Sequence, residues 1–172
     1  GEFESAQLCL RSAEPLSGVH LAASDLRGEA GLIPASAITW NPVGYVPLTK
    51  NTPGTPEAEL CCQAPRQVPD PLLPPDPVDV AADSTQPLWI TVRVPRDAAA
   101  GRYEGEVMVR WTGGEAAVPV SLTVWPFELP VERHLVFTNW MDAGRLAEHH
   151  KVEVYSDAFF ELLGTYARAA AE

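Results

Sequence analysis

Residues 86–126 read QPLWITVRVPRDAAAGRYEGEVMVRWTGGEAAVPVSLTVWP, and three β-strands can be recognised in them. Apolar residues alternate with polar or aromatic ones over 88–94, and the same alternation returns over 103–111 and 118–124. A period of two is that of a strand with one buried face. This part of the chain therefore predicts three consecutive antiparallel strands that share one apolar face.

Two local features connect these strands. The sequence Thr-Gly-Gly-Glu at 112–115 predicts a two-residue hairpin turn of type I′, because adjacent glycines accept the positive φ that this turn needs. Tyr103 begins a strand just after a crossover that contains Gly101. This is the setting of a tyrosine corner, in which the phenol bonds a backbone group a few residues upstream. A core tyrosine without that bond is the alternative.

Earlier segments can supply a second sheet. Residues 3–10 predict a strand with Ala6, Leu8 and Leu10 on one face, and shorter strands are indicated around 19–21 and 38–40. Three strands with one apolar face need a covering layer, so we expect a mainly β fold over residues 1–130. The predicted class is an antiparallel β-sandwich of immunoglobulin or fibronectin type.

Proline dominates the middle of the chain, and most of the 17 prolines lie between residues 34 and 87. Because proline lacks the amide donor and fixes φ, we expect a Pro-rich loop at about 47–87. The run at 68–77 predicts an ordered, extended loop that lies across a sheet, with Leu72 and Leu73 as apolar anchors. A disordered linker is the alternative.

The periodicity changes after Pro130. A short apolar run within 134–141 predicts a strand, and a polar loop then leads to Ser156, a candidate helix N-cap. Apolar residues follow at helical spacing to Ala170. Residues 131–172 therefore predict the first strand–helix unit of a truncated (β/α)8 barrel, and both ends of the sequence look cut.

Composition excludes several classes of function. The net charge is −11, from 23 acidic and 12 basic residues, so the chain lacks the basic surface that binds nucleic acid. No apolar run approaches the ~20 residues that span a membrane. Cys9, Cys61 and Cys62 show no zinc-ligand spacing and are expected to be free or buried thiols.

Motifs that would carry chemistry are absent. The sequence has no GxSxG, GxxxxGK[ST], GxGxxG or HExxH, and we expect neither a metal nor another cofactor. His149 and His150 are neighbours, which favours a solvated loop pair over a shared metal. The pairs Glu2 with Glu4 and Glu104 with Glu106 could imitate catalytic carboxylates, but a solvated outer face opposite arginines explains them more simply.

Trp89 and Trp125 are not explained by a solvated outer face. Strand parity places Trp89 and Trp125 on outward faces, where a large aromatic side chain implies that something covers it. Three coverings are possible: an adjoining domain, the Pro-rich loop, or a sugar ring stacked on the indole.

Taken together, several segments resemble the amino-terminal region of glycoside hydrolase family 123. The segments that match, in the family's order and spacing, are 1–8 (GEFESAQL), 43–46 (VGYV), 69–74 (PDPLLP), 86–105 (QPLWITVRVPRDAAAGRYEG) and 124–130 (VWPFELP).

This resemblance implies a β-sandwich followed by a (β/α)8 barrel, in a retaining β-N-acetylgalactosaminidase. In such enzymes the substrate's 2-acetamido oxygen attacks the anomeric carbon, an Asp orients the amide, and a neighbouring Glu acts as acid and then base. No Asp-Glu or Glu-Asp dipeptide occurs in these 172 residues, so no catalytic residue can be assigned.

The resemblance also suggests where substrate would be met. Barrel active sites lie at the C-terminal ends of the strands, and here that end carries Asn139, Trp140 and Asp142. Trp140 could stack on a sugar and Asn139 could bond a hydroxyl; ordinary packing at the barrel mouth is the alternative.

The sequence thus predicts a non-catalytic domain of a hydrolase that acts on N-acetylhexosamine glycans. Its partners would be an intramolecular catalytic domain and, through that domain, a carbohydrate; the family resemblance favours a secreted or periplasmic protein of a bacterium. The alternatives are a carbohydrate-binding or adhesion module, and a relative whose barrel has lost its acids.

Overall fold

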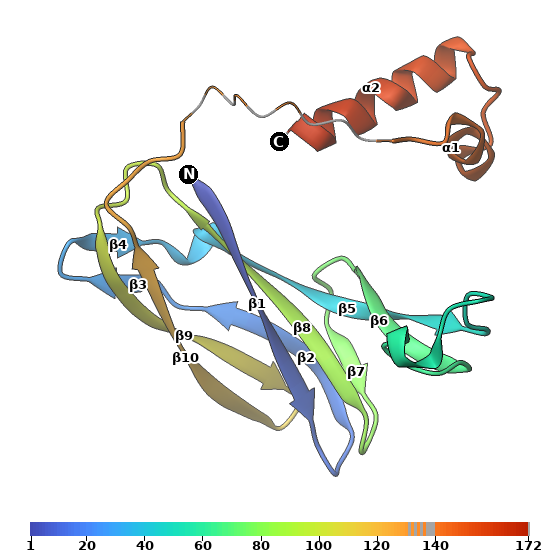
Figure 1. The fold of residues 1–172 in the computed structure, drawn as a ribbon. Helices are drawn as coiled ribbons and strands as arrows, with labels where there is room; N and C mark the ends of the chain where they lie inside the picture. The colour runs from blue at the N-terminus through green and yellow to red at the C-terminus, as the bar shows by residue number, and fades with distance from the viewer. Residues whose placement is uncertain (131, 133, 135, 137–139, 172) are drawn as a thin grey trace. The chain divides into compact units, whose positions relative to one another are not determined.

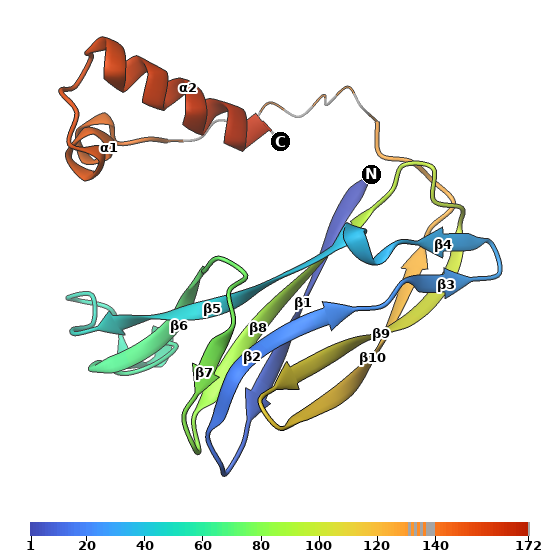
Figure 2. The ribbon, with the colours of Figure 1, turned by 180° about the vertical axis from the view of Figure 1, so that it is seen from behind.

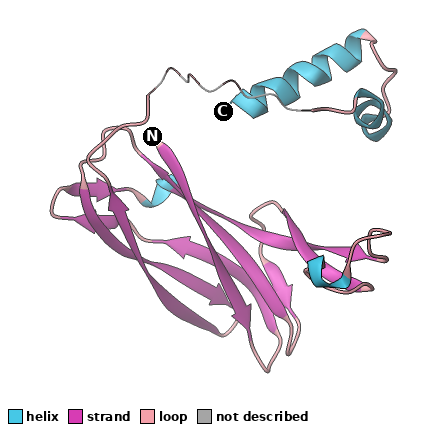
Figure 3. Cartoon of the chain, in the orientation of Figure 1, coloured by secondary structure: helices cyan, strands magenta, loops and turns pink. Residues whose placement is uncertain are grey.

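The structure, a computed structural model, describes residues 1–130, 132, 134, 136 and 140–171. The chain divides into two compact units, Gly1–Leu129 and Pro130–Glu172. The strands and two short 3-10 helices, η1 (Ala35–Ala37) and η2 (Glu57–Glu59), belong to the first unit, and the two α-helices to the second (Figures 1 and 3).

Two antiparallel sheets make up the first unit (Figures 1 and 2). The first sheet has the order β1 (Glu2–Arg11), β8 (Thr85–Val94), β5 (Ile38–Leu48), β6 (Arg66–Leu72). The second has the order β4 (Gly31–Ile33), β3 (Leu26–Gly28), β9 (Gly101–Trp111), β2 (Leu16–Ala23), β7 (Val78–Val80). In it β3 and β2 pair with successive stretches of β9, and β10 (Gly114–Val124) pairs with β9 along its whole length. The predicted sandwich of two antiparallel layers is therefore confirmed.

The core lies between the inner faces of the two sheets, where the period-two residues meet. The main buried cluster consists of Leu16, Val19, Leu21, Val80, Leu88, Ile90, Val107 and Val109. A second cluster consists of Leu26, Ile33, Val92 and Tyr103. The sequence alternation that predicted these strands is the alternation of buried and exposed side chains, because neighbouring Cβ atoms point to opposite faces.

The immunoglobulin strand order is not observed. In that order the first two strands belong to one sheet. Here β1 pairs with β8 in the first sheet, whereas β2 pairs with β9 and β7 in the second. Alternation tells which side of a strand is buried, but it does not tell which sheet the strand joins.

The hairpin between β9 and β10 also differs from its prediction. Trp111 pairs with Gly114, so the two turn residues are Thr112 and Gly113. Only Gly113 of these two has a positive φ, at 93°. A type I′ turn requires positive φ at both central residues, whereas a type II turn requires it only at the second, as found here.

The proline-rich segment is not one long loop. Residues 66–72 form β6, an edge strand that pairs with β5. Leu72 and Leu73 are both half-exposed, so neither is a buried anchor. Leu73 is nevertheless tied to β5, because its amide donates to the Pro42 carbonyl oxygen at 2.9 Å and its own carbonyl oxygen accepts from Asn41 Nδ2 at 2.8 Å. Prolines are tolerated on β6 because its outer edge has no partner strand, which is where a missing amide costs least.

The predicted tyrosine corner is present at the start of β9. The hydroxyl of Tyr103 donates a hydrogen bond to the carbonyl oxygen of Ala99 at 2.8 Å, and the side chain is buried. This bond satisfies the phenol within the sandwich.

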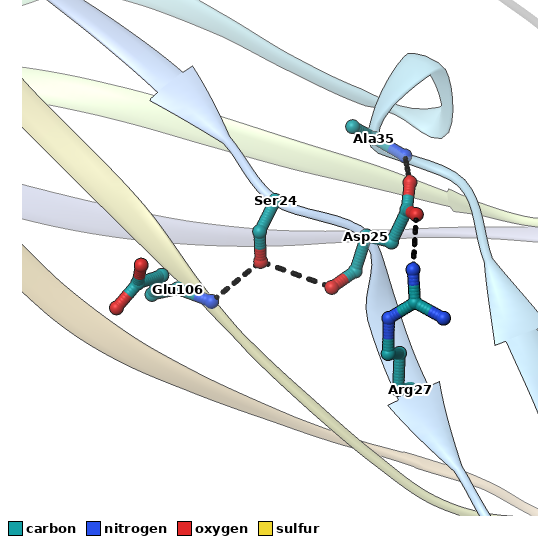
Figure 4. A network of polar contacts seen from close by, with 5 residues as sticks. All are labelled: Ser24, Asp25, Arg27, Ala35 and Glu106. Atoms are coloured by element: carbon teal, nitrogen blue, oxygen red, sulfur yellow. Dashed lines mark hydrogen bonds and ion pairs between the residues drawn. The ribbon is translucent and has the colours of Figure 1, made fainter.

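A polar network joins β2, β3 and β9 (Figure 4). The backbone amide of Glu106 donates to Ser24 Oγ at 3.0 Å, and Ser24 Oγ donates to the carbonyl oxygen of Asp25 at 2.9 Å. The Asp25 carboxylate accepts from the Ala35 amide and from Arg27, each at 3.0 Å. Gly105 permits this close approach, because a Cβ there would lie 2.7 Å from both Ser24 Oγ and the Asp25 carbonyl oxygen.

The second unit contains α1 (Ala143–His150) and α2 (Asp157–Ala171). Ser156 caps α2 as predicted, since its Oγ accepts from the Phe159 amide at 3.2 Å. The predicted polar loop before it is wrong over 143–150, where α1 forms and buries Leu146 against Phe159. The strand predicted at 134–141 falls largely on residues outside the described part of the chain; the described residues 134, 136, 140 and 141 are in neither helix nor strand.

Candidate functional site

A groove of about 730 Å³ opens on one side of the first unit, between an edge strand of each sheet. Its walls come from the first half of β1 and the second half of β10, and β8 contributes Ile90, Val92 and Val94. The β10 wall runs without a break from Val120 to Val124. The groove is therefore a gap in the closure of the sandwich, lined mainly by apolar residues.

The segment after β10 forms one lip of this groove. Trp125 and Phe127 are each 65% exposed, and Leu129 is 41% exposed. Arg96 holds the segment in place, because its Nη2 donates to the Leu129 carbonyl oxygen at 3.0 Å and lies 3.9 Å from Glu128. Three apolar side chains are thus held at a groove that none of them fills.

Carboxylates stand on the opposite wall. Glu2 and Glu4 line the groove on the same strand face as Leu8 and Leu10, which pack on the core. The expectation that these acids lie on an outer face is therefore wrong.

The observed partners of the arginines also differ from the expected pairing of these strand acids with Arg93 and Arg110. Arg93 stacks over the Phe3 ring, 5.8 Å from its centroid, and does not meet an acid there. Arg110 pairs with Glu115 at 3.2 Å, and Glu104 pairs with Arg102 at 2.8 Å. The Glu104 and Glu106 carboxylates are exposed, so this pair is a solvated one as expected.

The groove offers little chemistry of its own. Its ionisable groups are Glu2, Glu4, Arg96 and Glu128, with no histidine, cysteine or lysine among the lining residues. Within the described residues, no group of three His, Cys, Asp or Glu side chains could hold a metal ion. The arrangement suits the binding of an apolar partner better than acid–base or nucleophilic catalysis.

Of the two predicted outward tryptophans, only Trp125 lies at the groove. Trp89 is half-buried on the outer face of the first sheet, between Gln7 of β1 and Asn41 of β5. The structure therefore does not bring the two indoles into one site.

The residues predicted to face substrate belong to the second unit. Trp140 is 99% exposed. Asp142 is the N-cap of α1, and its carboxylate accepts from the Arg145 amide at 3.0 Å. Asn139 lies outside the described residues. In this chain Asp142 thus has a structural role as a helix cap, and the placing of Asn139, Trp140 and Asp142 at a substrate site stays a prediction.

The neighbouring histidines lie at the end of α1, not in a loop as predicted. Both are exposed, and His150 Nε2 lies 2.8 Å from the Tyr166 hydroxyl of α2. This bond links the two helices and gives His150 a structural partner.

The cysteines are free thiols. Cys9 and Cys61 are exposed and Cys62 is half-buried. Desolvation raises the pKa of the Cys62 thiol, and the hydrogen bond and charge of Cys61 raise it further, while Arg66 opposes them. A thiol with a raised pKa is a poor nucleophile at neutral pH.

The groove was not predicted from the sequence, although a signal was present. Trp125, Phe127 and Leu129 alternate with polar or proline residues after the last strand of the sandwich, where no further strand of that sheet remains to cover them. An apolar alternation without a covering element indicates an interface.

The comparisons with known proteins can be set beside this geometry. A family model described as the glycoside hydrolase 123 N-terminal domain matches residues 1–111. The chain belongs to this family. The glycoside hydrolase 123 match ends at the last residue of β9, so β10, the Trp125 lip and the second unit lie beyond it. No curated protein matches the chain.

A solved structure extends the comparison across both units. It is a family 123 glycoside hydrolase from Clostridium perfringens, studied for glycolipid glycan hydrolysis, with a TM-score of 0.78 and 19% sequence identity. The alignment covers 94% of this chain and 28% of that chain. The chain thus shares the fold of part of that hydrolase and spans less than a third of its length.

Proposed function

We propose that this chain is the non-catalytic amino-terminal part of a glycoside hydrolase, with residues 1–130 as a supporting β-sandwich and 131–172 as the first strand–helix unit of a catalytic (β/α)8 barrel. Membership of the glycoside hydrolase 123 N-terminal family is the observation that carries this proposal. The α1–α2 pair supports the second part, because its small core of Leu146, Ala147 and Phe159 is too small to stand alone.

The catalytic acids would then lie outside these residues. The sequence lacks the Asp-Glu pair that a substrate-assisted mechanism requires, and the groove lacks a general acid placed beside a nucleophile. The sandwich would act by holding the barrel in its folded form.

The substrate class we propose is a glycan that ends in β-linked N-acetylgalactosamine. The study of the similar Clostridium perfringens hydrolase concerns glycolipid glycans, which makes such glycans the first to test. In the substrate-assisted retaining mechanism the 2-acetamido group is the nucleophile, so a sugar with a plain hydroxyl at C2 cannot react this way.

Matched nitrophenyl glycosides test the proposal. The full-length protein that contains this chain should hydrolyse the N-acetyl-β-galactosaminide, and the galactoside should react at least about a thousandfold more slowly. The isolated 172-residue chain should hydrolyse neither. Equal rates on both glycosides, or turnover by the isolated chain, would contradict the proposal.

A second candidate function is carbohydrate binding by the sandwich itself, favoured by the exposed Trp125 indole beside the groove. An exposed indole can stack on the apolar face of a sugar ring. Titration of the 172-residue chain with N-acetylgalactosamine, followed by tryptophan fluorescence, separates the two. Saturable quenching that Trp125→Ala abolishes would support this second function, and no change would exclude it for this sugar.

A further inference from the structure

The edges of the two sheets are not protected equally. An unpaired strand edge exposes amide and carbonyl groups to any other chain, and proteins usually guard such edges with proline, inward-pointing charge or short strands. Of the five edge strands among the described residues, β4 and β7 have only three residues each, and β6 carries Pro69 and Pro71. These three edges are guarded.

The other two edges face the groove, and only one of them is guarded there. On β1, Glu2 and Glu4 point to the inner side, which places charge where an added strand would bury apolar side chains. On β10, Pro119 interrupts the edge at mid-strand, but Val120–Val124 (VSLTV) has neither proline nor charge. Among the described residues, the second half of β10 is thus an open edge.

This open edge coincides with unfilled apolar space. The same five residues form the unbroken wall of the groove, and Ile90 and Val92 of β8 line it as well. A strand added to β10 would direct alternate side chains into the groove and the others to solvent.

The path of the chain brings later polypeptide to this side of the sandwich. Because Arg96 fixes the Leu129 carbonyl at the groove, the polypeptide leaves the sandwich beside the open edge. The similar hydrolase is more than three times as long as the part aligned here, and the family model describes an N-terminal domain, so we take further polypeptide to follow it. A tethered segment binds at a high effective concentration.

We propose that an extended segment of the parent hydrolase, from the polypeptide that follows residue 172, adds to the edge of β10 at Val120–Val124 and fills the groove. This inference rests on the proposed function, because it takes the parent to be a longer hydrolase. The segment carries aliphatic residues on its inner face and a basic or amide side chain opposite Glu2 and Glu4. Trp125 and Phe127 pack over it.

Hydrogen exchange measures this pairing directly. The amides of Val120–Val124 should exchange at least about tenfold more slowly in the full-length protein than in the 172-residue chain, because strand addition protects the outer amides of the edge. Ser121→Lys with Thr123→Lys, on the exposed face of the open edge, should remove that protection. Ala117→Lys, on the same face before Pro119, is the matched control and should leave it intact.

Each other outcome overturns the inference in a recognisable way. Equal exchange in both proteins excludes strand addition. Protection that appears in the isolated chain as its concentration rises would show that a second copy of the chain binds the edge. Protection that appears on adding N-acetylgalactosamine would show that a sugar binds the groove. The glycoside assay is independent: an inactive parent with protected amides refutes the proposed function alone, and an active parent with unprotected amides refutes this inference alone.

Discussion

The hydroxyl of Tyr103 donates a hydrogen bond to the carbonyl oxygen of Ala99, four residues upstream, at 2.8 Å. The ring of Tyr103 is 1% exposed and belongs to the core cluster with Leu26 and Ile33. One side chain therefore joins the connection between the two sheets to the packed interior.

Tyr103→Phe should destabilise the sandwich by about 1 kcal/mol, because the ring still packs but the Ala99 carbonyl loses its donor. Urea unfolding followed by tryptophan fluorescence measures the change in the free energy of unfolding. Tyr45→Phe is the comparison. The Tyr45 hydroxyl also donates to a backbone carbonyl oxygen, that of Thr85, but the side chain is 40% exposed, so water can replace the lost bond and the loss of stability should be smaller. Equal free energies of unfolding for the Tyr103 variant and the unmodified chain would show that the hydrogen bond of the tyrosine corner does not stabilise the sandwich.

Gly105→Ala should cost more, about 2 kcal/mol or above. The added methyl would lie 2.7 Å from Ser24 Oγ, the Asp25 carbonyl oxygen and Leu26 Cδ2, so β3 and β9 would have to separate. Gly164→Ala in α2 is the contrast, because its nearest contact, Arg168 Nη1, is 3.5 Å away and alanine favours a helix. Thermal unfolding should show a clear drop in melting temperature only for the first variant.

Asp25→Ala should lower the free energy of unfolding by about 1–2 kcal/mol, because the Ala35 amide loses its carboxylate acceptor. Asp25→Asn keeps an acceptor oxygen and should retain most of the stability. Arg27→Ala should change it by less than about 1 kcal/mol, since the Arg27 side chain is mostly exposed. The reverse ranking, with Arg27 dominant, would show that the ion pair rather than the amide bond holds this junction.

Alkylation of Cys62 by iodoacetamide should be slower in the folded chain than in urea, because the raised pKa leaves less thiolate at a given pH. In a Cys9→Ala background, Cys61→Ala should shift the alkylation of folded Cys62 to lower pH, because it removes the hydrogen bond and the charge of Cys61 that raise the Cys62 pKa. Peptide mass spectrometry reads each site separately.

The same pKa shift affects stability. Because folding raises the pKa of the Cys62 thiol, folding favours its protonated form, and stability falls as the pH rises through the alkaline range where the thiol ionises. Urea unfolding of the Cys9→Ala chain across that pH range tests this. A rise in its free energy of unfolding with pH, absent when Cys62 is also changed to alanine, would contradict the direction of the pKa shift.

Trp140→Ala in the full-length protein should lower turnover of the N-acetyl-β-galactosaminide about tenfold or more without lowering the melting temperature, because the stacking of its indole on the sugar that the sequence predicts would be lost. The 99% exposure of Trp140 in this chain is the reason to expect no loss of stability. Phe160→Ala, another exposed aromatic, is the control. Unchanged kinetics would exclude Trp140 from the site.

Some of the fold could be predicted because it depends on local pattern. The alternation in β8, β9 and β10 is enforced by the pleat, and the corner at Tyr103 follows from a glycine-containing crossover before a strand. The helix α2 was predictable from its Ser156 cap and apolar spacing. In each case neighbours in sequence are neighbours in space.

The errors occur where distant segments decide the outcome. Residues 66–72 are a strand because β5 offers a free edge, and α1 forms around Leu146 because Phe159 packs on it. Neither of these partners can be read from the segment itself.

The amino-acid sequence alone determined the buried faces of β8, β9 and β10 through their alternation, and the tyrosine corner through Gly101 and Tyr103. The likeness to family 123 rests on particular segments, above all residues 86–105. The tertiary structure alone decided which sheet each strand joins. It thereby left the outer edge of the second half of β10 without a partner strand among the described residues, beside an apolar groove with Trp125 at its lip. The physical reason is the distance along the chain over which each property is determined. The direction of a side chain depends on its own backbone, whereas the neighbours of a strand depend on the free energy of packing whole layers together.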